Sequence, residues 1–187
     1  MADRNVQSSD SNRRTLAAGL VILGAVSRLL PHPPNMTSVG AMGLFAGSRL
    51  KKWQALLLPL ACMLITDPIL AKINGYAAFR WGTLFIYASL MLNVLIGRWL
   101  VKSDSPARIG LAAVICSVQF FVVTNFSVWL LDGYYPHTWA GLVACYVAAI
   151  PFFQWTFAGD LIYTAVLFGI YALVDRKVLR PAEVPAR

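Results

Sequence analysis

The sequence predicts an all-α membrane protein, a polytopic bundle of six transmembrane helices. The first reason is composition: 58% of the 187 residues are hydrophobic and 13% are charged, against about 45–50% and about 25% in soluble domains. The second reason is that the apolar residues gather in long runs bounded by basic residues. The six expected spans are residues 15–30, 36–50, 53–70, 83–101, 109–131 and 157–174.

The basic residues are divided unequally between the two sides that these spans define. With the N-terminus in the cytoplasm, 13 of the 16 Lys and Arg residues fall on the cytoplasmic side, and Arg28, Lys72 and Arg80 fall on the other. This asymmetry follows the positive-inside rule, and it favours a multi-pass protein of the cell (inner) membrane with both termini cytoplasmic. The cytoplasmic set is Arg4, Arg13, Arg14, Arg49, Lys51, Lys52, Arg98, Lys102, Arg108, Arg176, Lys177, Arg180 and Arg187.

The termini outside the spans are polar. We expect a disordered cytoplasmic tail at residues 1–14, one transmembrane domain at 15–176, and a second cytoplasmic tail at 177–187. The net charge of +8 lies at the membrane boundaries, where basic residues orient the chain and meet anionic lipid. The expected partner of this charge is therefore the lipid bilayer, and nucleic-acid binding is not expected.

The first two spans are short and are separated by residues 31–35, which contain three prolines. Proline lacks the backbone donor and clashes with the preceding turn, so this run predicts a tight turn that lies below the outer membrane surface. The second span contains Gly43 and Gly47, a GxxxG spacing that lets helices approach closely in lipid. That spacing fits either packing within the chain or a docking face for another subunit.

Residues 141–153 are apolar all round and could be taken for a seventh span. An extra crossing would move Arg176 and Lys177 to the outer side. Fusing the segment with residues 157–174 would give a helix of about 51 Å, too long for one straight crossing, and Pro151 interrupts it. We therefore expect a re-entrant or interfacial helix before the last span.

Polar and aromatic residues concentrate in the three outer connections, which follow the first, third and fifth spans. Polar groups inside a membrane protein are costly, so each one is a functional hypothesis. Because odd-numbered spans all exit outward, we expect these side chains to form one outward-facing substrate-binding region. The candidates are Arg28, His32, Asn35, Asp67, Arg80, Trp81, Asn125, Tyr135, His137 and Asp160.

Other interpretations of these residues remain open. The arginines and aspartates could form a structural clamp between helix ends instead of a ligand site, and the aromatic residues could be an interfacial belt. Deeper in the membrane, we expect Asn93 and Gln119 to bond across helices. The three cysteines fit small buried hydrophobes. The sequence has no metal-ligand spacing and no catalytic motif, so we expect no metal, no cofactor and no enzyme activity.

Three segments carry a family resemblance: RLLPHPPNMTSVGA at residues 28–41, PLACMLITD at 59–67, and IPFF, GDL and FG at 150–153, 159–161 and 168–169. They resemble a small uncharacterised bacterial membrane family that is itself similar to the substrate-binding (S) components of energy-coupling factor (ECF) transporters. The resemblance implies a six-helix fold with the ligand near the outer face. It also implies a transmembrane coupling subunit and ATPases as partners, docked through small residues on the first helix, although the Ala-x-x-x-Ala common there is not clearly present.

These observations favour a substrate-binding subunit for the uptake of a vitamin-like micronutrient, with the small molecule bound at the outer face. The alternative is a non-transporting scaffold or accessory subunit of another membrane complex.

Overall fold

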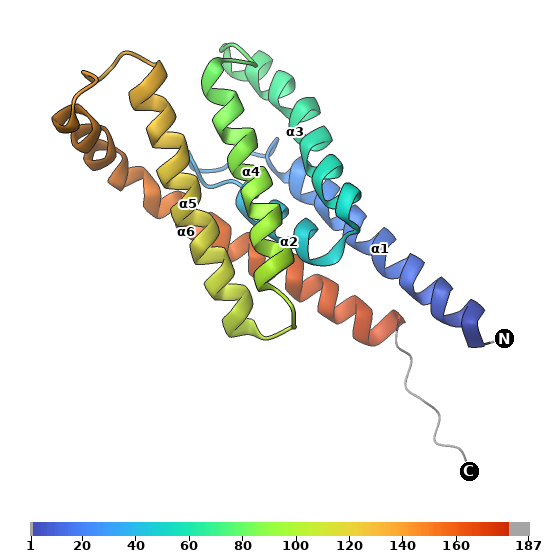
Figure 1. The fold of residues 1–187 in the computed structure, drawn as a ribbon. Helices are drawn as coiled ribbons and strands as arrows, with labels where there is room; N and C mark the ends of the chain where they lie inside the picture. The colour runs from blue at the N-terminus through green and yellow to red at the C-terminus, as the bar shows by residue number, and fades with distance from the viewer. Residues whose placement is uncertain (1, 180–187) are drawn as a thin grey trace.

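The computed structural model describes residues 2–179, and every element among them is helical, as the all-α prediction requires (Figure 1). The helices bury mostly apolar side chains against one another in one continuous core. The elements are α1 (Ala2–Ser27), α2 (Val39–Arg49), α3 (Lys52–Asn74), α4 (Trp81–Leu100), α5 (Pro106–Leu131), α6 (Trp139–Val174) and a short π-helical turn, η1 (Asp175–Leu179).

Four of these helices, α3, α4, α5 and α6, are long and apolar enough to cross a membrane, which indicates a multi-pass membrane protein. The prediction of six spans is wrong for the first two segments. A crossing needs about 20 apolar residues, whereas α2 has 11 residues and spans about 16 Å. Helix α1 has 26 residues, but its first half is polar.

Helix α2 forms the centre of the bundle, and nine of its residues, Val39 through Gly47, are buried. Its backbone lies directly against α4: a Cβ atom on Gly47 would stand 1.9 Å from the carbonyl oxygen of Val94, and one on Gly97 would stand 2.1 Å from that of Leu44. The Gly43–Gly47 spacing therefore serves packing within the chain. Its other interpretation, a docking face for a further subunit, is wrong because α2 is enclosed by its own bundle.

Helix α6 runs without interruption for 36 residues and contains Pro151, so the predicted re-entrant helix followed by a separate span is wrong. Membrane helices tolerate proline where neighbouring groups satisfy the backbone atoms that it frees. At about 54 Å, α6 is longer than a ~30 Å hydrocarbon core and must tilt or extend beyond it. Figure 1 shows it crossing the bundle obliquely to α4 and α5. Likewise α3 continues through Pro68 to Asn74, four residues beyond the expected end of its span.

Both ends of the described chain lie at the same end of the bundle (Figure 1), where Arg13 Nε donates to Asp175 Oδ1 at 2.6 Å. The α4–α5 connection belongs to this end too, because Arg49 at the end of α2 pairs with Asp104. Helix α1 begins at Ala2, and the cytoplasmic tail expected at 1–14 stays a prediction. Of the expected C-terminal tail, residues 177–179 belong to η1, and residues 180–187 lie outside the described part.

Candidate functional site

The connection between α1 and α2, residues 28–38, is irregular because its three prolines cannot continue a helix. In Figure 1 it crosses the bundle below the level of the α3–α4 and α5–α6 connections. Asn35 within it adopts a left-handed conformation with φ 66°, which asparagine tolerates better than most residues. Non-helical backbone at membrane depth occurs where it is buried in protein or lines a cavity, and this segment lines one.

Two adjoining cavities of about 160 Å³ each lie beside this connection. They share three wall residues, Asn35, Phe120 and Thr156, and together they just reach the ~300 Å³ at which small-molecule sites begin. Their walls combine hydrogen-bonding side chains with aromatic rings. The first is lined by Arg28, Asn35, Thr37, Val39, Gly40, Met63, Ile86, Phe120, Thr156 and Asp160. The second is lined by Asn35, Phe120, Phe121, Thr124, Asn125, Ala149, Phe152, Phe153 and Thr156.

Asp160 forms the base of the first cavity and is 2% exposed. Its Oδ2 accepts a hydrogen bond from the Ser117 hydroxyl at 2.6 Å, and the backbone N–H of Ala41 also donates to the carboxylate. The side chain of the residue before α2, Ser38, does not cap that helix; its hydroxyl donates instead to the Gly24 carbonyl at 2.5 Å. Asp160 therefore caps α2 from another helix, where the positive end of the helix dipole stabilises a carboxylate.

Arg28 and Asp67 form a buried ion pair of 2.7 Å that joins the end of α1 to α3. Arg28 also donates to the Thr66 hydroxyl, and the Tyr87 hydroxyl of α4 donates to Asp67 Oδ2 at 2.8 Å. Arg28 Nε is buried without a hydrogen-bond partner in the described structure. Arg28 and Asp67 thus form the ion pair that the clamp interpretation expects, and Arg28 also faces the first cavity.

The structure brings four predicted site residues, Arg28, Asn35, Asn125 and Asp160, to these cavities. Asp67 lies behind them as the partner of Arg28. Asp160 has hydrogen-bonding partners in Ser117 and the Ala41 backbone, but none of the described residues forms an ion pair with it. It also lies in the middle of α6, far from the outer end of its span where the sequence placed it, because α6 begins 21 residues earlier at Trp139.

The remaining candidates lie elsewhere. The His32 ring contacts the Pro33 carbonyl within its own turn at 2.9 Å. Arg80 and Trp81 are exposed at the start of α4. The His137 ring packs against Trp129, with 5.3 Å between ring centroids, and Tyr135 lies in the same α5–α6 connection. None of these five side chains lines either cavity.

Several wall residues were missed by sequence reasoning although a signal was available. On α5, the missed wall residues Phe120, Phe121 and Thr124 share one helix face with Ser117 and with the predicted Asn125, because these five positions follow the i, i+3, i+4, i+7, i+8 spacing. On α6, Thr156 precedes Asp160 by four residues and shares its face. A polar stripe on an otherwise apolar helix points inward, so these patterns indicate the cavity walls.

The expected tie between Asn93 and Gln119 is confirmed. Gln119 Nε2 on α5 donates to Asn93 Oδ1 on α4 at 2.6 Å and to the Ser89 hydroxyl at 2.9 Å. Asn93 and Ser89 are fully buried, so the network joins α4 to α5 inside the apolar core.

The fold defines the chain as a small helical membrane protein, with two partly polar interior cavities beside a proline-rich connection. The chain belongs to the family of unknown function DUF6580, whose profile matches residues 8–184. No curated protein and no solved structure matches it. These comparisons give no link to the S components of ECF transporters, and that resemblance stays a prediction.

Proposed function

We propose that the protein binds a small polar organic molecule in the two cavities beside the α1–α2 connection. The observation that carries this proposal is the break in the helices there: α1 ends, an irregular segment lines the cavities, and the half-length helix α2 begins at their base. In membrane transporters, interrupted helices of this kind supply backbone groups and helix ends to a substrate.

The wall chemistry favours a ligand with hydrogen-bond donors on one side and a flat apolar body. Asp160 has no cationic partner among the described side chains, so an amine or N–H group of a ligand would suit it. Asn35, Thr37 and Thr156 offer further hydrogen bonds. In the second cavity, the ring centroids of Phe121 and Phe153 lie 4.9 Å apart, and aromatic rings stack well on planar groups.

Uptake of a vitamin-like micronutrient across the inner membrane is the activity that we propose for this site. The three segments that carry the family resemblance are far apart in the chain, yet residues of each, such as Asn35, Met63 and Asp160, line the first cavity. The excess of basic residues near the termini supports cytoplasmic ends and an outward-facing connection. A coupling subunit and ATPases would then be the partners.

A second candidate is a scaffold or accessory subunit of another membrane complex. It is favoured by the small volume of each cavity, about 160 Å³, and by the internal pairing of Arg28 with Asp67. In that case the polar residues hold the bundle together and no ligand is needed.

Mass spectrometry of molecules extracted from gently purified protein tests the proposal. The compound that is found is then added back to ligand-free protein while thermal unfolding is followed. The variant Thr156→Val removes one wall hydroxyl at nearly constant volume and should weaken binding about tenfold, the loss of one or two hydrogen bonds.

Thr164→Val is the matched control for this ligand, because it makes the same change two turns further along α6, outside both cavities and in the wall of a separate groove. It should leave affinity unchanged. Failure to recover any ligand, together with co-purification of an unrelated complex, would favour the scaffold. Equal effects of the two variants on affinity would place the ligand elsewhere.

A further inference from the structure

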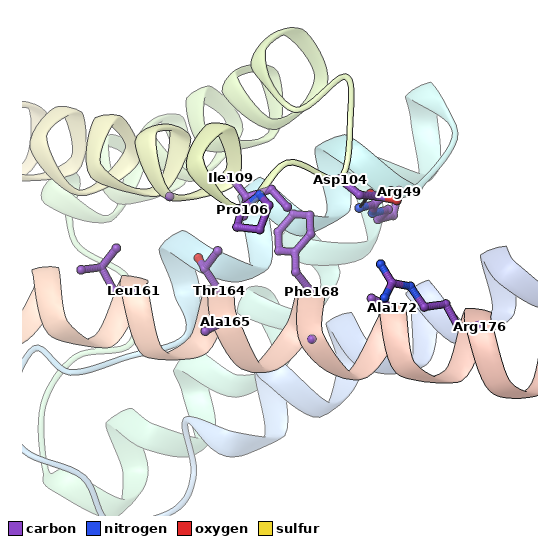
Figure 2. A pocket seen from close by; sticks show the side chains of 12 residues that line it. Arg49, Asp104, Pro106, Ile109, Leu161, Thr164, Ala165, Phe168, Ala172 and Arg176 are labelled. Atoms are coloured by element: carbon purple, nitrogen blue, oxygen red, sulfur yellow. Dashed lines mark hydrogen bonds and ion pairs between the residues drawn. The ribbon is translucent and has the colours of Figure 1, made fainter.

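A second and larger hollow lies at the opposite end of the bundle, between α5 and α6, and holds about 450 Å³. Figure 2 shows α6 forming its floor and the start of α5 its upper wall. On α6 the lining residues Leu161, Ala165, Phe168 and Ala172 recur every three or four positions, and Arg176 continues the row into η1, so they form one stripe. The stripe is apolar until its last member, and Thr164 beside it adds one hydroxyl to the lining.

The end of this groove beside η1 carries two arginines. The Arg49 guanidinium lies over the rings of Phe168 and Tyr171, 5.2 and 4.9 Å from their centroids, and pairs with Asp104. Its Nε is buried and lacks a hydrogen-bond partner within the described chain. Arg176 lies at the same end (Figure 2) and forms no ion pair with another described residue. The mouth of the groove is therefore net positive.

The groove has the dimensions of one membrane leaflet. The apolar part of the stripe, from Leu161 to Ala172, spans 11 helical steps, or about 17 Å, which is close to the ~15 Å half-thickness of a hydrocarbon core. The arginines would thus lie at the level of the lipid head groups while the apolar part runs to the bilayer centre. Gly110 and Gly169 line the groove and place no side chain in it. A Cβ atom on either residue would meet nothing within 4 Å, so the space beside both glycines is empty.

We propose that this groove binds an anionic phospholipid, with the phosphate between Arg49 and Arg176 and one acyl chain along the α6 stripe. The two guanidinium groups, of which Arg49 alone has a carboxylate partner among the described residues, supply the reason for an anionic head group, and the apolar wall supplies the reason for a chain. A zwitterionic lipid would offer the same chain but a neutral head group, so it should bind more weakly. The lipid site is separate from the two cavities beside the α1–α2 connection and does not depend on their ligand.

The test compares phosphatidylglycerol with phosphatidylcholine, each added to the delipidated full-length protein in detergent. Binding is followed by native mass spectrometry and by the midpoint of thermal unfolding. Phosphatidylglycerol should bind wild-type protein at least fivefold more tightly than phosphatidylcholine, the discrimination expected from one basic residue at a lipid surface. Equal affinities for the two lipids would overturn the proposal.

Two variants and two controls locate the site. Arg176→Gln should reduce phosphatidylglycerol affinity about fivefold, whereas Arg108→Gln, a basic residue of the same end that does not line the groove, should have little effect. Gly169→Leu should fill the groove and weaken both lipids, whereas Gly19→Leu on the open face of α1 should not. If Gly169→Leu fails to fold, Gly110→Leu from the opposite wall replaces it.

Equal losses from Arg176→Gln and Arg108→Gln would show only general attraction between a basic surface and anionic lipid. Full affinity after the groove is filled would show that no acyl chain enters it. Either result would reject the site.

Discussion

The carboxylate of Asp160 lies directly against the backbone of Gly40, so that a Cβ atom at residue 40 would stand 2.1 Å from Asp160 Oδ1. A glycine at the start of α2 and an acidic residue in the middle of α6 are thus in direct contact. Because Gly40 has no side chain, the carboxylate can reach the backbone N–H groups at the N-terminus of α2, which have no acceptor within the helix. The contact anchors the only short buried helix of the described bundle and forms the base of the first cavity.

Gly40→Ala should therefore lower the free energy of unfolding by about 1–3 kcal/mol, the range for overpacking a closed site. The added methyl group must displace the carboxylate from Ala41 and Ser117. Thermal unfolding of the detergent-solubilised protein measures the effect. Gly19→Ala is the control, since its methyl group meets nothing within 4 Å and should be neutral or stabilising. Equal stability of the two variants would mean that Asp160 does not cap α2.

The Arg28–Asp67 pair leads to a prediction about coupling. Removing either partner, by Arg28→Gln or Asp67→Asn, should cost about 3–5 kcal/mol because an unpaired charge stays in a buried setting. The double variant should cost clearly less than the two single effects added together. A double-mutant cycle on unfolding, run with and without added ligand, measures this coupling. Additive effects would argue against a clamp, and a coupling that requires ligand would assign the pair to the binding site.

Several parts of the fold could be predicted from the sequence because they depend on local composition. The runs of apolar residues locate α3, α4 and α5 to within a few positions. The polar residues Asn93 and Gln119, isolated in apolar helices, correctly indicated a bond between helices. In both cases the apolar membrane interior requires polar groups to be hydrogen-bonded within the protein, which favours helices for the backbone and contacts between helices for the polar side chains.

The errors arise where tertiary contacts override local signals. Pro151 breaks an isolated helix, yet α6 passes through it. The segment around α2 is as apolar as a span, but its glycines let α4 approach so closely that it becomes a buried core helix. The site shows the same limit: topology placed Asp160 near an outer surface, whereas the structure pairs it with Ser117 in the interior. Nothing in the spacing of residues 117 and 160 reveals that contact.

The crossing of α2 and α4 depends on two reciprocal glycines. A methyl group on Gly47 would meet the Val94 carbonyl, and one on Gly97 would meet the Leu44 carbonyl, at 1.9 and 2.1 Å. Because these obstacles are backbone atoms, relief requires the helices to move apart. Gly47→Ala and Gly97→Ala should each destabilise the fold by about 3 kcal/mol, at the upper end of overpacking effects. Together they should cost less than the sum, because the first separation already makes room for the second methyl group.

Gly110→Ala provides the comparison for this pair, since its Cβ atom would occupy open space. Unfolding in denaturant or by heat should leave it close to wild type. If Gly47→Ala behaved like Gly110→Ala, the close approach of α2 and α4 would not contribute to stability.

The orientation in the membrane can be tested with single cysteines, because the native Cys62, Cys116 and Cys145 are buried. Tyr134 in the α5–α6 connection is 73% exposed, and Ser103 lies exposed in the α4–α5 connection at the opposite end. If the basic end faces the cytoplasm, a membrane-impermeant maleimide should label Tyr134→Cys on intact spheroplasts and label Ser103→Cys only after lysis. The wild-type protein should remain unlabelled in both conditions. The reverse pattern would mean that the bundle has the opposite orientation and that the proposed uptake site faces the cytoplasm. Labelling of both positions on intact spheroplasts would contradict a membrane-spanning bundle altogether, because these connections lie at opposite ends of α5.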